Sequence, residues 1–440
     1  MVKKFMLSLL TVSMFFRAPV TAAPGVEGLI GEFRSQTKCE SVSVVVYDHG
    51  EITYFGDSDS LYQIGSMTKS FTGLAVQKLI NNGILSKDDT VSDLIPGFTA
   101  YYDSSEVQIT VEDLLMQRSG YTNSESDYPS ASEGMTLEDW AWSISGNDLK
   151  SRPGTEYSYS NANYNLLGLI LEKKTGLSYS EFMETAVLDP LGLDSTSAGI
   201  PENKDRIIEG TRLGFRNVFG YEVPVREGSI PAGYLYSDTE DIGKWMKAWI
   251  EGSDPDMEAV MDHLETEGDY YAGWERFGED ITGHSGGTPN YSSRIVFSRS
   301  MKTGVCVLTN LNVASTTDSL CNSIFSAKVT GDVHDSLICD VWTVFDIIFT
   351  AVSAVGAVSL IVVLCLKKKG VLISVLSVYA VLTALILIIF PIIFGADIKT
   401  IALTWAPWSF LAGTAIMVIN AVSAGIKLLV KVNEGRAKTG

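Results

Sequence analysis

The sequence predicts an α/β domain followed by three membrane helices. Strand-like segments lie near both ends of residues 24–340, and helical segments lie between them. This order indicates one sheet built from both ends of the body. Three long apolar runs occupy 341–430, and a shorter apolar run follows two lysines at the N-terminus. We therefore assign 1–23 to a signal peptide, 24–340 to an exported domain and 341–430 to the membrane.

The body is predicted to begin with a hairpin and to end with two strands and a helix. Strand-like alternation marks 41–47 and 51–55, joined by the turn Asp48-His49-Gly50. Helical periodicity is found at 67–81, 111–116, 162–174 and 238–251, and two of these segments stop near Gly83 and Gly176. Strands at 293–298 and 304–309 then precede a closing helix at 317–327.

The first 23 residues have the pattern of a secretory signal peptide. Lys3 and Lys4 precede the apolar run 5–16, which is too short to span a bilayer comfortably. Cleavage is expected after Ala22 or Ala23. A retained N-terminal anchor is the alternative, and Arg17 after the apolar run keeps it open.

The C-terminal region is predicted to cross the membrane three times. The runs 341–366, 371–394 and 402–430 each provide the ~20 apolar residues that a crossing needs. The turn Lys367-Lys368-Lys369 and the tail 431–440 are basic, so both are expected in the cytoplasm. The body then faces the periplasm or the extracellular side of the cell membrane. Asp346 is expected to reach water at the interface.

The composition restricts the possible partners. The chain has 33 Lys and Arg against 52 Asp and Glu, a net charge of −19, so nucleic acid is not expected. Five cysteines and four scattered histidines fit neither a disulfide scaffold nor a metal site, and no cofactor is implied. Cys39 with Cys306 or Cys321 would join the two ends of the body, while buried free thiols fit equally well.

The first candidate motif is Ser66-Met67-Thr68-Lys69. In a helix, residues three apart share a face, so a Lys69 held neutral could take the proton of the Ser66 hydroxyl. Ser35 and Lys38 have the same spacing, but polar residues follow them. Ser66 instead opens a periodic helix, which favours it as the nucleophile.

Two further motifs fit chemistry at a serine. Tyr159-Ser160-Asn161 supplies a phenol that can relay a proton and an amide that can bind a carbonyl, just before an apolar helix. Tyr121-Thr122-Asn123 has the same spacing, but its polar surroundings suggest a turn. The third motif is His284-Ser285-Gly286-Gly287, where the Gly287 N–H and that of Ser66 could bind an oxyanion.

In this order, the three motifs resemble those of the serine hydrolase family of class C β-lactamases, low-molecular-weight penicillin-binding proteins, D-aminopeptidases and related esterases. Other similar segments are 109–120, 157–168, 189–193 and 231–237, and the likeness extends over residues 40–325. It implies a β-lactamase/transpeptidase-like α/β (α+β) fold. This fold has an antiparallel sheet flanked by helices and an inserted, mainly helical subdomain at roughly 85–230.

The resemblance also implies a mechanism. Ser66 would attack a carbonyl and form an acyl-enzyme, while Lys69 and Tyr159 move protons. The amides of Ser66 and Gly287 would bind the oxyanion. Asn161, His284 and Gly286 would position the substrate. No metal or cofactor takes part.

The substrate class follows from two features of the same likeness. His284-Ser285-Gly286 replaces the K-T-G usual in β-lactamases of this group and resembles D,D-peptidases and aminopeptidases. A catalytic body with three membrane helices resembles the prodrug-activating D-Asn peptidases of nonribosomal peptide pathways. We expect a peptidase or amidase acting on small D-amino-acid-containing peptides, either cell-wall-like or N-acyl prodrugs. A β-lactamase or esterase is one alternative, and a sensor that is acylated without turnover is another. The oligomeric state is not indicated.

Overall fold

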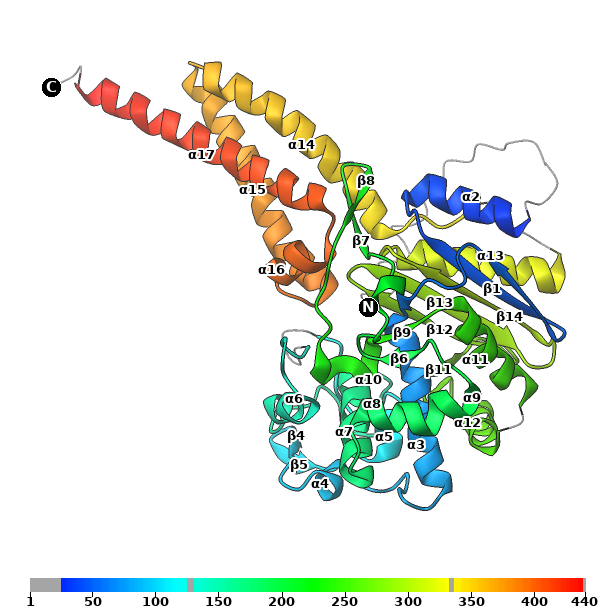
Figure 1. Ribbon diagram of the computed structural model, residues 1–440. Helices are drawn as coiled ribbons and strands as arrows, with labels where there is room; N and C mark the ends of the chain where they lie inside the picture. Colours follow the sequence, from blue (N-terminus) through cyan, green and yellow to red (C-terminus); the bar gives the residue numbers. More distant parts are fainter. Residues whose placement is uncertain (1–24, 125–129, 253, 332–335, 438–440) are drawn as a thin grey trace.

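The computed structural model describes residues 25–124, 130–252, 254–331 and 336–437. The predicted signal peptide at 1–23 lies outside these residues. Figure 1 shows one sheet covered by helices, a mainly helical part beside it, and three long helices that project away from both.

The central sheet has seven strands in the order β10-β11-β12-β13-β14-β1-β2, and every neighbouring pair is antiparallel. The strands are β1 (Val42–Asp48), β2 (Glu51–Phe55), β10 (Tyr270–Tyr271), β11 (Trp274–Arg276), β12 (Thr282–Thr288), β13 (Tyr291–Ser298) and β14 (Thr303–Thr309). Strand β1 pairs with β14, with Val45 opposite Cys306. This confirms the predicted sheet built from both ends of the body.

Side chains alternate along β1 and so reach two separate layers. Val44 and Val46 belong to a core shared with α2 (Val26–Thr37) and α13 (Ala314–Thr330). Val45 and Tyr47 belong to the core on the other face, which includes side chains of α3 (Thr68–Asn81), α11 (Thr239–Glu251) and α12 (Pro255–Thr266). In Figure 1, α2 and α13 cover one face of the sheet and α11 the other.

The helical part surrounds one buried helix, α7 (Asn161–Thr175). Ser160 caps its first turn, every residue from 162 to 171 is buried, and Gly176 ends it with φ 73°. Around it lie α4 (Val91–Leu94), β4 (Ala100–Tyr102), β5 (Ser105–Val107), α5 (Val111–Leu115), α6 (Leu137–Ile144), α8 (Tyr179–Met183), α9 (Asp189–Leu191) and α10 (Ile230–Gly233). A small sheet of β3 (Tyr62–Gln63), β9 (Leu235–Ser237) and β6 (Ser197–Ala198) adjoins this part. The packing around helix α7 therefore fixes the position of its N-terminal residues in the body.

Three helices are long and apolar enough to cross a membrane: α14 (Val341–Cys365), α15 (Lys369–Phe394) and α17 (Trp408–Ala437). The third helix begins at Trp408, later than the apolar run that starts at residue 402 predicted. A short helix α16 (Ile398–Thr400) and a π-helical turn (Ile401–Trp405) come first, and the chain turns at Ala406-Pro407. Helix α17 also continues through most of the expected tail, as far as Ala437.

The prediction that Asp346 reaches water was wrong. Its side chain is fully buried in α14, and its carboxylate accepts hydrogen bonds from the Arg216 backbone N–H and the Ser409 hydroxyl, each at 2.7 Å. Arg216 belongs to the turn between β7 (Thr211–Gly214) and β8 (Asn217–Gly220). The hairpin therefore supplies the partners that a buried carboxylate needs.

The five cysteines are all free thiols, so neither possible bridge from Cys39 forms. The Cys39 thiol is buried and donates to the Ser41 carbonyl and the Asn310 side chain, and burial raises its pKa to about 12. The sequence left open a disulfide from Cys39 or buried free thiols, and in the structure Cys39, Cys306 and Cys321 are buried free thiols.

Candidate active site

Ser66 lies in a tight turn that precedes helix α3. The turn is a 3₁₀ helix over Gly65–Met67, and Ser66 is partly exposed whereas its two neighbours are buried. The hydroxyl of Ser293, on β13, donates to the Ile64 carbonyl at 2.8 Å. The sheet thus holds the turn from behind and leaves the Ser66 side chain facing outward.

Lys69 lies one turn later and points back to Ser66. Its Nζ is 3.0 Å from Ser66 Oγ, 2.8 Å from Asn161 Oδ1 and 2.6 Å from the Ala232 carbonyl oxygen. The side chain is completely buried, and burial lowers the pKa of Lys69 well below its usual value. A neutral amine at this distance can act as a base toward the Ser66 hydroxyl.

Tyr159 joins the same group from the start of α7. Its hydroxyl forms a hydrogen bond with Ser66, and its ring centroid lies 4.9 Å from Lys69 Nζ. Burial raises the pKa of Tyr159, so the phenol keeps its proton in the resting state. It is therefore placed to donate a proton rather than to supply a charge.

A buried amide network fixes the segment that carries Tyr159 and Asn161. Gln117 is fully buried, and its Oε1 accepts from the Ser160 N–H at 2.9 Å and from Asn163. Asn163 in turn accepts from Ser119 at 2.5 Å. Because the side-chain amides of Gln117 and Asn163 are held in these hydrogen bonds, the loop before α7 has a defined position relative to Lys69.

His284 lies on β12, and its side chain is only 2% exposed. Its Nδ1 lies 2.5 Å from the Ser285 carbonyl oxygen, and its ring is 6.0 Å from those of Tyr159 and Tyr270. Burial, with a contribution from Lys69, lowers its pKa to about 3, so the imidazole is neutral at ordinary pH. The side chain supports Tyr159 from beside the cavity.

The two glycines of the motif have different surroundings. A Cβ at Gly286 would collide with the Ile64 carbonyl, whereas a Cβ at Gly287 would meet nothing within 4 Å. Strand β11 pairs with β12 only at Thr282 and Gly283. Within the described chain, therefore, the same side of β12 from His284 to Thr288 has no strand partner, and an extended substrate could lie there with its carbonyl near the Gly287 amide.

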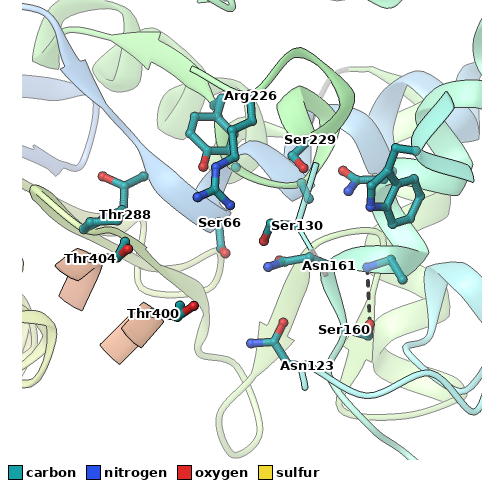
Figure 2. Close-up of a pocket in the computed structure, with 18 of the residues that line it drawn as sticks. Ser66, Asn123, Ser130, Ser160, Asn161, Arg226, Ser229, Thr288, Thr400 and Thr404 are labelled. Carbon is teal, nitrogen blue, oxygen red and sulfur yellow. Dashed lines mark hydrogen bonds between the residues drawn. The ribbon is translucent and has the colours of Figure 1, made fainter. Parts of the chain in front are cut away.

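A cavity of about 210 Å³ opens above Ser66 (Figure 2). Three of the seven predicted site residues line it: Ser66, Asn161 and Gly287. Lys69, Tyr159, His284 and Gly286 lie beside or behind this lining. The structure therefore brings all three motifs to one place, with Lys69 and Tyr159 in contact with Ser66.

The cavity also contains residues that the sequence did not single out. They are polar for the most part and include Asn123, Ser130, Arg226, Thr288, Thr400 and Thr404. Arg226 is the one charged side chain among the described lining residues. Asn123 belongs to the second Tyr-x-Asn spelling, which the sequence assigned to a turn. Ser35 and Lys38, the second Ser-x-x-Lys spelling, are exposed at the end of α2.

Comparison with protein families gives one match across most of the body. The family model described as Beta-lactamase matches residues 26–322. Protein flp of Staphylococcus aureus is 32% identical over 275 residues, which is 57% of this chain and 53% of that protein. A putative D-alanyl-D-alanine carboxypeptidase of Escherichia coli is 33% identical over 150 residues, 31% of this chain and 33% of that one. The chain thus spans about half the length of the Staphylococcus relative and about a third of the length of the Escherichia coli relative.

Solved structures share the fold of the body. A penicillin-binding protein homologue from Pyrococcus abyssi superimposes with a TM-score of 0.57 and 25% identity, over 65% of this chain and 73% of that one. A D-stereospecific amidohydrolase from Streptomyces gives 0.57 and 20%, over 70% and 100%. A beta-lactamase/D-alanine carboxypeptidase from Pseudomonas syringae gives 0.58 and 16%, over 70% and 98%. The last two likenesses concern the fold alone.

Proposed function

Because this chain belongs to the beta-lactamase family, we propose that it is a serine hydrolase in which Ser66 forms an acyl-enzyme. The observation that carries the proposal is the 3.0 Å distance between Ser66 Oγ and Lys69 Nζ at the floor of the cavity. Buried lysine next to an accessible serine is an arrangement for nucleophilic attack, because the neutral amine accepts the hydroxyl proton.

The proposed reaction has two halves. In the first, Ser66 Oγ attacks the substrate carbonyl and its proton passes to Lys69, while the amides of Ser66 and Gly287 hold the oxyanion. The intermediate collapses when Tyr159, which is hydrogen-bonded to Ser66, gives its phenol proton to the leaving group, and the Lys69 ammonium beside its ring returns a proton to the phenolate. In the second half, water attacks the ester carbonyl and gives a proton to the neutral Lys69. The bond between the acyl carbon and Ser66 Oγ then breaks, and Lys69 returns that proton to Oγ, which releases the acid.

The preferred substrate in this proposal is a small peptide or amide that contains a D-amino acid. Support comes from the similarity to the putative D-alanyl-D-alanine carboxypeptidase of Escherichia coli and from His284 in the place where β-lactamases of this group usually have Lys. The polar lining suits peptide groups, since hydroxyls and amides can pair with backbone N–H and C=O. Three helices long enough to cross a membrane suggest that the body acts at a cell membrane, facing outward.

A substrate panel with a Ser66→Ala control tests this function. The membrane protein is incubated with N-acyl-D-Asn amides, acyl-D-Ala-D-Ala, D-Ala amides, a simple ester and a cephalosporin, and products and protein mass are followed. Ser66-dependent cleavage of one peptide class is expected. Cleavage of only the ester or cephalosporin would reassign the substrate. An acyl mass on Ser66 without turnover would identify a sensor, and no adduct at all would refute the nucleophile.

A further inference from the structure

The loop between the second and third membrane helices forms part of the Ser66 cavity. Thr400, Thr404 and Trp405 line the same cavity as Ser66 and Gly287. Figure 2 shows Thr400 and Thr404 on the side where Thr288 ends β12, with Asn161 on the other. A segment outside the part of the chain matched by the family model therefore contributes a wall to its candidate active site.

A buried arginine fixes this loop to the body. Arg212 on β7 is 2% exposed, and its guanidinium donates to the carbonyl oxygens of Ala402, Leu403 and Ala406 at 2.6, 2.7 and 2.6 Å. The same group stacks on the Trp408 ring at 4.2 Å. A cation taken out of water needs such partners, so the body and the loop are held together by contacts that are costly to break.

Three further contacts secure the same junction. The buried carboxylate of Asp346 joins the β7–β8 turn to Ser409 at the start of α17. A Cβ at Gly214 would lie 2.8 Å from Trp408 Cβ, so the hairpin approaches α17 as closely as glycine allows. The Tyr221 hydroxyl also donates to the Leu403 carbonyl at 2.9 Å. The wall is thus a fixed part of the cavity.

The loop presents its side chains to the cavity through an unusual turn. Ile401–Trp405 is π-helical, and such turns are often found at functional sites because they redirect side chains. Ile401 is buried, whereas Thr404 and Trp405 stay partly exposed and line the cavity. Thr400 donates to Asp397 at 2.6 Å, which orients it within the short helix α16.

We propose that Thr400, Thr404 and Trp405 are specificity-determining residues, which contact a part of the substrate remote from the scissile bond. The inference rests on the proposed function, because the cavity must hold the Ser66 acyl-enzyme. The Thr404 hydroxyl can donate to or accept from a peptide group of an extended chain, whereas the Thr400 hydroxyl, which donates to Asp397, can only accept from a peptide N–H. The Trp405 ring suits an apolar side chain next to them. The substrate class is therefore an elongated peptide rather than a single amino acid amide.

Substrates of two lengths test this assignment on the full-length protein in detergent. The minimal substrates are the p-nitroanilides of N-acetyl-D-Ala and N-acetyl-D-Asn. The extended substrates form two series. In the first, two residues precede the D-residue of the nitroanilide. In the second, two residues follow the D-residue and take the place of the nitroanilide. Thr404→Val and Trp405→Ala are each expected to lower kcat/KM about tenfold on one extended series, through KM, while the minimal substrates change less than twofold. The affected series identifies which side of the scissile bond meets the wall.

Lys399→Ala is the matched control, because Lys399 is exposed one residue before Thr400 and does not line the cavity. Wild-type behaviour of this variant on every substrate is expected. Equal losses on minimal and extended substrates, or no loss on either, would overturn the wall assignment while Ser66-dependent turnover remains. If no substrate is turned over in a Ser66-dependent way, the proposed function fails, and this inference fails with it.

A labelling experiment gives a second readout that does not depend on loop stability. With Cys339 and Cys365 replaced by Ser, because these two free thiols are not buried, a maleimide should react with Thr404→Cys, and prior reaction of Ser66 with a fluorophosphonate bearing a peptide-length chain should block it. Methyl fluorophosphonate should leave the thiol reactive, and Lys399→Cys should react in every case. Full labelling of Thr404→Cys behind the long adduct would contradict the proposed contact.

Discussion

Gly65 leaves no room for a side chain against the backbone nitrogen of Gly287. A Cβ on Gly65 would approach that nitrogen more closely than van der Waals contact allows, and the φ of 53° is one that glycine adopts readily. The nucleophile turn and β12 are therefore in direct backbone contact. This contact brings the two amides assigned to the oxyanion, those of Ser66 and Gly287, to the same side of the cavity.

Gly65→Ala is expected to separate these amides and to lower kcat about 10²- to 10³-fold, the usual cost of losing one oxyanion donor. Steady-state kinetics on the substrate identified by the panel measures the loss. Gly83→Ala is the matched control, since Gly83 also has a positive φ (70°) near the other end of α3 but has nothing within 4 Å of its Cβ position. Gly83→Ala should lose about 1 kcal/mol of stability through its positive φ alone, and Gly65→Ala more, because its Cβ also meets the backbone of β12. Full activity in Gly65→Ala would contradict the oxyanion assignment.

Lys69 should make the enzyme lose activity as the pH falls. Burial lowers its pKa, and the neutral amine is the form that accepts the Ser66 proton. Activity is therefore expected to be full above the lowered pKa and to fall as the pH drops through it. Lys69→Met should lose at least about 10²-fold in kcat. Lys69→Arg should stay inactive at every pH, because guanidinium does not deprotonate.

Lys78→Met controls for the loss of a lysine from α3. Lys78 lies near the far end of the same helix and pairs with Asp254 and Asp256. This variant should keep the wild-type pH profile. An active Lys69→Arg enzyme at neutral pH would show that Lys69 is not the base.

His284 should make stability depend on pH. Its pKa is about 3 in the folded protein against 6.5 for the free side chain, so the unfolded chain binds more protons between these values. The free energy of unfolding is expected to be highest above pH 6.5 and to decline as the pH falls toward 3. His284→Gln should show a shallower decline in thermal unfolding. His49→Gln, which removes an exposed histidine, should follow the wild type. An unchanged slope in His284→Gln would contradict a buried neutral imidazole.

Features with a local signature could be predicted from the sequence. The hairpin, the helix after Ser66 and helix α7 each follow from periodicity and capping residues within a few positions. The three motifs were found because nucleophile, base and amide have fixed spacings. The sheet order followed in outline, since strand-like runs at both ends of the body must find partners.

Features set by distant contacts could not be predicted. Strand β12 has the sequence Thr-Gly-His-Ser-Gly-Gly-Thr, which lacks apolar alternation, and its strand form depends on pairing with β13. Asp346 is buried because the β7–β8 turn and Ser409 supply its hydrogen bonds. Thr404 is brought to Ser66 by the packing of Arg212 against the loop, and no spacing in the sequence records that contact.

Arg226 should confer a preference for anionic substrates. It is the one charged side chain among the described residues that line the cavity, and it is only partly buried. Among the described residues no carboxylate pairs with this guanidinium, and a guanidinium in a polar cavity favours a carboxylate, which it can bind through two parallel hydrogen bonds. Arg226→Gln is therefore expected to lower kcat/KM about tenfold for a substrate with a free carboxylate, and to leave its amide analogue nearly unchanged. Arg226→Lys should recover part of the preference, since it keeps the charge but not the two-point geometry.

Lys204→Gln removes an exposed charge elsewhere on the body and should preserve the wild-type ratio of the two substrates. If Arg226→Gln and Lys204→Gln change that ratio equally, the preference comes from the overall charge of the protein and not from the cavity.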